Sequence, residues 1–283
     1  MEHLAQRSSV EALADLMRGR QTLVLSGAGI STESGIPDYR GPQSAAWRTQ
    51  PISYREFISD PSSRARYWAR SAVGWPRVSA ARPNAGHAAL ADMERAGALC
   101  GVITQNVDGL HRAAGSRRVL ELHGSLAEVV CLQCGTRESR QDLQGRILSL
   151  NPGWAEGPFR QAAILPDGDA LVDVPQDGSF LIPACLRCTG MLKPDVTFFG
   201  ENVPRARVEQ ALAMLADSEM LLVLGSSLAV YSGYRFVVQA VQDAKPVAII
   251  NRGSGRGDPL ATVRVEAALG EALPRLASML VSA

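Results

Sequence analysis

Short apolar runs alternate along the chain with stretches of helical periodicity. The runs are continuous and rich in Leu or β-branched residues, as strands covered on both faces are. They occupy residues 22–26, 102–104, 220–224 and 247–250. Apolar residues at helical spacing occupy 10–17, 86–97, 205–217, 232–243 and 270–281. This alternation predicts an α/β fold built on a doubly wound parallel sheet.

Two stretches break the alternation. Residues 41–84 contain most of the Trp residues and many Arg residues, and we expect a helical insertion there. Residues 127–195 have a centre rich in Pro, Gly and Asp, and we expect a small inserted module there. The segments left for the sheet domain are 1–40, 85–126 and 196–283.

The composition is that of an ordinary folded protein. Of the 283 residues 46% are apolar and 20% charged, which excludes a disordered or collagen-like chain. The 29 Lys and Arg residues nearly balance the 28 Asp and Glu residues, so the formal charge of +1 gives no indication of nucleic-acid binding. No apolar run approaches the roughly 20 residues of a membrane span, and residues 1–20 lack the pattern of a signal or transit peptide. We therefore expect a cytoplasmic protein with no nucleic-acid or membrane partner.

Four of the five cysteines form two Cys-x-x-Cys pairs, Cys131 with Cys134 and Cys185 with Cys188. In a cytoplasmic chain such pairs favour a metal over disulfides. Four thiolates complete a tetrahedral zinc site with no open position, so we expect one structural zinc rather than a catalytic one. The spacer between the pairs is longer than in common zinc motifs, and four unrelated thiols are the alternative. We expect Cys100, which precedes a strand, to be simply buried.

A glycine-rich turn at residues 27–29 follows directly on the first predicted strand. Glycines at such a turn let backbone N–H groups approach a pyrophosphate, and a following helix N-terminus adds positive potential. Thr32 replaces the third glycine of the dinucleotide fingerprint, and no acidic residue stands about 20 positions further on. The next loop carries Asp38 and Arg40 among breaker residues, which suits a flap over a polar ligand. A plain strand-to-helix turn is the alternative.

Polar side chains also follow the other predicted strands. Gln105, Asn106 and Asp108 come after the second strand and could read ribose hydroxyls and a carboxamide. Gly-Ser-Ser at 225–227 offers N–H and hydroxyl donors to phosphate or ribose. Asn-Arg-Gly at 251–253 could form hydrogen bonds with a ribose or with the edge of an adenine. In an open α/β sheet ligands bind beyond the carboxyl ends of the strands, so these groups are candidates for one site. Ordinary turns and an Asn/Asp helix cap are the alternatives.

A single histidine, His123, stands at the end of an apolar run. Gly124 removes the neighbouring side chain and opens access to the ring. Imidazole has the right unperturbed pKa for a general base at neutral pH. The alternative is a core histidine whose nitrogens are satisfied by neighbouring groups.

Taken in order, these motifs resemble the sirtuin family of NAD-dependent protein deacylases. The matching segments are GAGISTESGIPDYRG (27–41), TQNVDGLH (104–111), ELHGS (121–125), KPDVTFFGE (193–201), LGSSLAVYSGYRF (224–236), INRG (250–253) and the two cysteine pairs. The resemblance spans nearly the whole chain. It implies a large Rossmann-like NAD-binding domain and a small zinc domain, with NAD and an acyl-lysine peptide in the cleft between them.

The resemblance also implies a role for each matching residue. His123 is expected to be the general base and Asn106 a second catalytic residue. The residues expected to bind NAD are Gly27, Ala28, Gly29, Asp38, Tyr39, Arg40, Gln105, Asn106, Asp108, Gly225, Ser226, Ser227, Asn251, Arg252, Gly253 and Leu269. The residues expected to pair with the substrate peptide backbone, as an added strand, are Phe199, Gly200, Glu201 and Val230. The products implied are nicotinamide, free lysine and 2′-O-acyl-ADP-ribose.

Within the family, residues 66–76 (RYWARSAVGWP), 166–169 (PDGD) and 231–236 (YSGYRF) look like class II, the group that includes the mitochondrial sirtuin 4 of animals. This subclass suggests poor deacetylation and better turnover of longer or branched acyl groups. Residues 42–52 lack the Tyr-x-x-Arg pair that class III enzymes use for succinyl or malonyl groups, so a preference for acidic acyl groups is not expected.

Other functions fit parts of the pattern. Mono-ADP-ribosyl transfer to a protein uses the same bound NAD. A non-catalytic zinc protein that senses NAD has no need of a base at His123 or of Asn106. A conventional dehydrogenase is disfavoured because the ribose-binding carboxylate is missing.

Overall fold

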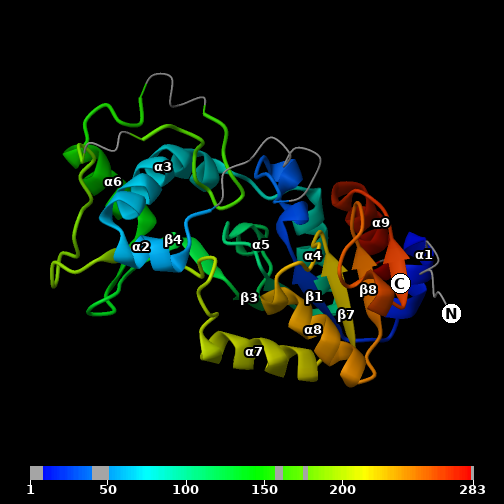
Figure 1. Ribbon diagram of the computed structural model, residues 1–283. Helices are drawn as coiled ribbons and strands as arrows, with labels where there is room; N and C mark the ends of the chain where they lie inside the picture. Colours follow the sequence, from blue (N-terminus) through cyan, green and yellow to red (C-terminus); the bar gives the residue numbers. More distant parts are fainter. Residues whose placement is uncertain (1–8, 40–50, 157–161, 175–177, 282–283) are drawn as a thin grey trace.

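The computed structural model describes residues 9–39, 51–156, 162–174 and 178–281. Its central feature is a sheet of six parallel strands in the order β3-β2-β1-β7-β8-β9 (Figure 1). These strands are β1 (Thr22–Ser26), β2 (Leu99–Thr104), β3 (Val119–Glu121), β7 (Met220–Leu224), β8 (Val247–Ile250) and β9 (Val263–Val265). The order reverses at β1, and the crevice beyond such a switch point is where ligands bind in open α/β sheets. The predicted doubly wound sheet is confirmed.

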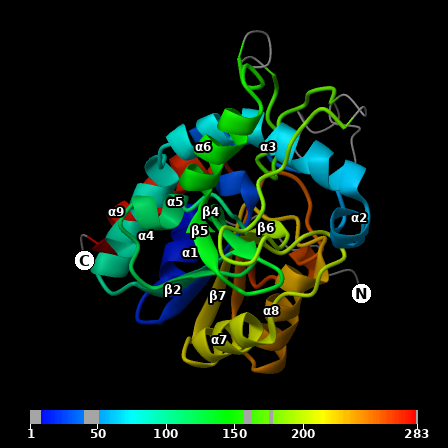
Figure 2. The same ribbon diagram turned by 90° about the vertical axis from the view of Figure 1, so that its left-hand side faces the viewer.

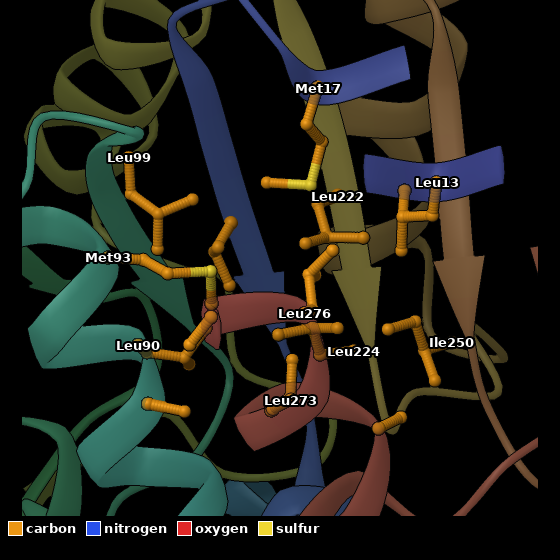
Figure 3. Close-up of a cluster of buried hydrophobic side chains, with 14 of the residues drawn as sticks. Leu13, Met17, Leu90, Met93, Leu99, Leu222, Leu224, Ile250, Leu273 and Leu276 are labelled. Atoms are coloured by element: carbon orange, nitrogen blue, oxygen red, sulfur yellow. The ribbon is translucent and has the colours of Figure 1, made fainter. Parts of the chain in front are cut away.

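Helices cover both faces of this sheet because its strands point alternate apolar side chains to opposite sides. In β1, Val24 joins one buried cluster while Leu23 and Leu25 join the other. The helices on the first face are α1 (Val10–Met17), α4 (Ala85–Arg95) and α9 (Leu269–Val281). Those on the second face are α7 (Arg205–Ala216) and α8 (Tyr231–Gln242). Figure 3 shows the first cluster, where leucines of α4 and α9 meet Leu222 and Leu224 of β7.

A second lobe lies beyond the carboxyl edge of the sheet, the edge at which β1, β2, β7 and β8 end. It comprises residues 51–80, 124–156, 162–174 and 178–196. Its antiparallel sheet has the order β5-β4-β6, with β4 (Gly124–Cys131), β5 (Arg137–Ser139) and β6 (Leu192–Val196). Its helices are α2 (Tyr54–Ser59), α3 (Pro61–Ala80) and α6 (Arg140–Leu150). Figures 1 and 2 both show α3 against α6.

One hydrophobic core holds the second lobe together. Phe57 and Trp68 from the helical stretch pack with Val129 and Ile147 from the cysteine-bearing stretch. The two regions expected as separate insertions therefore share their buried surface. The boundary expected after residue 126 falls inside β4, three residues after His123. The division into domains stays a prediction.

The short elements were harder to predict than the long ones. The helix α5 (Leu110–Ala113), the strands β3 and β9, and the 3₁₀ turns η1 (Ala28–Ile30), η2 (Thr32–Ser34) and η5 (Asp258–Leu260) are each three or four residues long. Strand β2 begins at Leu99, three residues earlier than predicted, and its pairing with β1 shifts register at Cys100. Cys100 is half-buried rather than buried. Among the described helices, none combines the length and apolarity that a membrane span requires.

Candidate functional site

A cavity of about 1020 Å³ opens between the carboxyl edge of the large sheet and the second lobe. Nearly all residues expected to bind NAD or peptide line it. They are Gly27, Ala28, Gly29, Asp38, Tyr39, Gln105, Asn106, Asp108, His123, Phe199, Gly200, Glu201, Gly225, Ser226, Ser227, Val230, Asn251, Arg252 and Gly253. Leu269 does not line the cavity, since its side chain is buried in the core between α9 and the sheet. Arg40 lies outside the described residues.

The glycines after β1 allow two loops to touch. A Cβ on Gly29 would lie 2.7 Å from Gly225 Cα, and one on Gly27 would lie 2.7 Å from Ser226 Cβ. The Gly29 N–H donates to the Gly225 carbonyl at 2.9 Å. The helix expected after the turn is present only as the short 3₁₀ helices η1 and η2. The glycines serve close packing at the switch point of the sheet.

The polar residues after β2 are held against this glycine turn. Asn106 Nδ2 donates to the Gly27 carbonyl at 3.2 Å and to Ser31 Oγ at 3.1 Å. Ser31 Oγ in turn donates to Asp108 Oδ2 at 2.7 Å. The other Asp108 oxygen accepts from the Leu110 N–H at 2.9 Å, so an Asp turn precedes α5, whose N-cap position is Gly109 with no side-chain cap. Asn106 is buried yet borders the cavity, and its orientation is fixed.

Both ring nitrogens of His123 have partners. Nδ1 lies 3.0 Å from the Gln105 carbonyl, which can only accept, so Nδ1 carries the proton. Nε2 lies 2.9 Å from Ser232 Oγ and is the acceptor of the neutral ring. Burial lowers the pKa of His123, and the positive charge of Arg207 lowers it further, against the opposing effect of the Gln105 carbonyl. The ring is therefore neutral at pH 7 and presents a basic nitrogen at the cavity.

Phe199 and Glu201, two of the residues expected to meet the peptide, are tied to the second lobe through Tyr54 and Lys193. The Phe199 carbonyl accepts from the Tyr54 N–H at 2.9 Å. Glu201 Oε2 accepts from the Phe198 N–H at 2.9 Å and pairs with buried Lys193 at 3.0 Å. The Glu201 carboxylate thus braces its own loop. The ring of Phe199 remains 44% exposed, at the mouth of the cavity.

The turn after β8 closes the far end of the cavity. Asn251 Nδ2 donates to the Gly253 carbonyl at 3.1 Å, and Arg264 donates to the same oxygen at 2.7 Å. Asn251, Arg252 and Gly253 all border the cavity. Residues 251–253 therefore form a turn, as the alternative interpretation predicts, and this turn also borders the cavity.

The four paired cysteines form one cluster. The Sγ atoms of Cys131 and Cys188 are 3.5 Å apart, those of Cys134 and Cys185 are 3.7 Å apart, and all four lie within 4.8 Å of one another. A tetrahedron with Zn–S bonds of about 2.3 Å places its sulfurs roughly 3.8 Å apart. The cluster therefore fits a zinc ion with four thiolate ligands and no open position, which indicates a structural site. It stands at the end of β4, outside the cavity.

Comparison with known proteins decides the family. The model of the Sir2 family matches residues 27–232, which include the glycine turn, the residues after β2, His123 and both cysteine pairs. The chain belongs to the Sir2 family. The cavity and the cysteine cluster therefore lie in a chain of this family.

Named relatives support this assignment over nearly the full chain. "NAD-dependent protein deacetylase 1" of Streptomyces coelicolor is 54% identical over 268 residues, covering 95% of this chain and 89% of its own. A protein of the same name from Mycobacterium avium is 50% identical over 276 residues, covering 97% and 96%. A solved Sir2 complex with a p53 peptide and NAD+ has a TM-score of 0.75 at 29% identity, covering 95% of this chain and 97% of that one.

Several residues that line or support the cavity were not assigned to it from the sequence. Ser232 contacts His123 from the start of α8, and Lys193 holds the loop of Glu201. Residues 166–168 reach the cavity from the second lobe, as does Tyr67 of α3. All of these residues lay inside segments quoted for the family resemblance, but only packing against α3 brings residues 166–168 to the cavity. Most of the 42–52 segment lies outside the described residues.

Proposed function

We propose that this chain is an NAD-dependent protein deacylase that acts on acyl-lysine side chains, acetyl-lysine included. The observation that carries the proposal is the neutral imidazole of His123, which borders the cavity beside the fixed amide of Asn106. The names of relatives at 50% identity or more support NAD-dependent deacetylation. A sensor that only binds NAD has no use for an oriented base at the cavity.

In the proposed arrangement NAD lies along the carboxyl edge of the large sheet. The loops after β1 and β7 would hold its phosphates and the turn after β8 its adenosine. Gln105, Asn106 and Asp108 would hold the nicotinamide ribose and carboxamide. The peptide would lie between Phe199–Glu201 and Val230, above His123. Leu269 is left out of this arrangement because its side chain is buried in the core.

The proposed chemistry uses one proton transfer by the protein. In sirtuins the acyl oxygen displaces nicotinamide from NAD, the ribose 2′-oxygen then attacks the acyl carbon, and one water replaces the lysine nitrogen, so that the products are nicotinamide, free lysine and 2′-O-acyl-ADP-ribose. His123 Nε2 would accept the proton of a ribose hydroxyl, while the Gln105 carbonyl keeps the Nδ1 proton in place and favours the imidazolium that forms. Such a base typically contributes about 10²–10⁴-fold to a rate. The thiolate-bound zinc would only support the second lobe.

Three further properties of this enzyme are proposed on the family resemblance alone. Class II membership and faster turnover of longer or branched acyl groups stay predictions, as does a cytoplasmic location. The comparisons give no support to the alternative of mono-ADP-ribosyl transfer.

The test is incubation with NAD and one acetyl-lysine peptide. We expect nicotinamide, deacetylated peptide and 2′-O-acetyl-ADP-ribose to form in equal amounts. Labelled NAD distinguishes the alternative, because label that ends on protein while the peptide stays acetylated would overturn the proposal. A peptide panel with acetyl, lipoyl, branched and long-chain acyl groups would then measure the acyl preference.

A further inference from the structure

The start of helix α8 carries an arginine to which the proposed function gives no role. Arg235 lines the cavity together with Tyr231 and Ser232 of the same helix. At about 3.6 residues per turn these three positions share one face of α8, whereas Phe236 points into the core of the large sheet. Because Ser232 contacts His123 Nε2, the Arg235 position lies about one helical turn from a neighbour of the proposed base.

The Arg235 side chain is directed back toward the N-terminal end of α8. Its guanidinium carbon lies 5.3 Å from the centre of the Tyr231 ring, as expected because long side chains on a helix extend toward its N-terminus. Val230, which is expected to pair with the peptide, directly precedes that end of the helix, and Tyr231 is 58% exposed. The positive charge is therefore held at the mouth of the cavity, next to the proposed path of the peptide.

No group in the described part of the chain neutralises this charge. No described residue forms an ion pair or a hydrogen bond with the Arg235 guanidinium, and its Nε is buried without a partner. Arg207, whose charge acts on His123, is by contrast paired with Asp195 at 2.9 Å. Residues 40–50, which continue the flap sequence, contain no Asp or Glu. A guanidinium is always charged at neutral pH, so this half-buried one leaves a place for an anionic group.

The position of Arg235 on α8 favours the peptide over NAD as the source of that anionic group. A Cβ on Gly233 would lie 2.3 Å from Gln105 Oε1, so the Gly233 face of the helix packs against the residues proposed to hold the nicotinamide ribose. Arg235 stands two positions further along, and residues two apart on a helix do not share a face. The guanidinium is therefore turned away from the proposed path of NAD.

We propose that Arg235 makes this enzyme prefer peptides that carry an Asp or Glu side chain beside the acyl-lysine. The Tyr231 ring supports the guanidinium through a cation–π contact, and the planar N–H fork suits a carboxylate. A neutral side chain at the same place would form no such pair, and a basic one would meet a like charge. This inference rests on the proposed deacylase function and names the class of protein segment on which it acts.

The test uses acetyl-lysine peptides that differ in a single residue, Glu or the isosteric Gln. That residue is placed in turn at each of the two positions before and the two positions after the acetyl-lysine. At one or more of these positions we expect the wild-type kcat/KM for the Glu peptide to be roughly three- to tenfold above that for the Gln peptide. The difference should lie mainly in KM, because the ion pair stabilises the ground state and the transition state alike. It should narrow as the salt concentration rises from about 0.05 M to about 0.5 M.

Three variants test the assignment to Arg235. Arg235→Gln removes the charge and should bring the ratio of Glu to Gln peptide near one. Arg235→Glu reverses the charge and should favour a peptide with Lys at the same position over the Glu peptide. Arg256→Gln is the matched control and should keep the wild-type ratio. Arg256 is exposed, does not line the cavity, and holds its guanidinium carbon 4.0 Å from the centre of the Tyr234 ring.

Direct binding separates this inference from the proposed function. The Kd of the same peptides, measured by fluorescence anisotropy, should show the same preference for Glu in wild type. Equal binding of Glu and Gln peptides at all four positions, or an equal loss of the preference in Arg235→Gln and Arg256→Gln, would overturn the inference. A higher KM for NAD in Arg235→Gln with an unchanged peptide ratio would also overturn it, because the arginine would then contact the dinucleotide. If the peptides bind with the Glu preference but none is deacetylated, the inference holds and the proposed deacylase function is wrong.

Discussion

At the scale of single residues, the environment of His123 prepares it as a base. Both nitrogens are oriented and burial lowers its pKa, so the ring is unprotonated at neutral pH. We expect His123→Ala to reduce kcat for deacetylation by roughly 10²–10⁴-fold, because the proton acceptor is lost. NAD affinity should stay near the wild-type value, since His123 only borders the nucleotide site. Binding by calorimetry and turnover by nicotinamide release measure the two effects, and near-normal turnover would remove His123 from the mechanism.

The glycine turn is a residue-scale feature of packing. A side chain on Gly29 would collide with the backbone of Gly225, which cannot move away cheaply because it too sits at a strand end. We expect Gly29→Ala to lower the free energy of unfolding by about 1–3 kcal/mol and to abolish NAD binding. Gly145→Ala is the control. Gly145 is exposed within α6 with no atom near its Cβ position, so that variant should gain about 0.5–1 kcal/mol. Urea unfolding measures both, and equal stabilities would contradict the packing argument.

At the scale of elements, two buried histidines join α4 and α5 beneath the site. The rings of His87 and His111 are 4.9 Å apart, and His111 Nε2 lies 2.8 Å from Ser26 Oγ at the end of β1. Burial lowers the pKa of both, that of His111 to about 3, while Asp108 opposes the shift at His87. Both rings therefore bind a proton less readily in the folded protein than in the unfolded chain, and His111 stays neutral down to about pH 3.

These depressed pKa values predict acid sensitivity. The contribution of His111 to stability is complete above about pH 6.5 and declines as the pH falls toward 3, by about 2 kcal/mol at pH 5. Urea unfolding between pH 7 and 5 should show this slope in wild type. The variant His111→Asn should be less stable at pH 7 but have a shallower slope. An equal slope in both proteins would mean that His111 takes up its proton without unfolding.

Element length decides what the sequence could predict. Strands β1, β7 and β8 are runs of four or five buried residues and were predicted with their observed bounds. Strands β3 and β9 have three residues each, too few for a periodic signal. The strand-end residues were found because parallel strands bring their carboxyl ends to one edge. Residues 166–168 were not assigned to the site from the sequence. Their position depends on the contact of Gly74 with Gly168, which lie far apart in the sequence.

At the scale of the whole molecule, the cavity lies between two separately built cores. One holds the large sheet and its helices, and the other holds the second lobe with the cysteine cluster at its edge. Val78, Leu126 and residues 166–168 line the cavity from the second lobe, and the loop of Phe199–Glu201 is bonded to that lobe through Tyr54 and Lys193. The geometry of the site therefore depends on the order of a lobe whose core includes Cys131 and Cys185.

Removal of zinc should consequently disorder the second lobe. The Trp residues of the described chain, Trp68, Trp75 and Trp154, all lie in that lobe, so intrinsic fluorescence follows its state. We expect purified protein to hold about one zinc per chain, and a strong chelator to shift the Trp emission to longer wavelength as deacetylation is lost. Far-ultraviolet circular dichroism should fall only in part, because the large sheet keeps its own core.

Two cysteine variants distinguish the effect of losing the zinc from the effect of losing a thiol elsewhere in the chain. Cys185→Ser removes one of the four ligands, so it should lose zinc and reproduce the effects of the chelator. Cys100→Ser changes a thiol that is half-buried against the large sheet and lies outside the cluster, so it should keep zinc, fluorescence and activity near wild type. A fully active Cys185→Ser protein without metal would contradict the structural role. Loss of activity with unchanged Trp emission would instead place the zinc in the chemistry, against the closed set of four thiolates that the cluster offers.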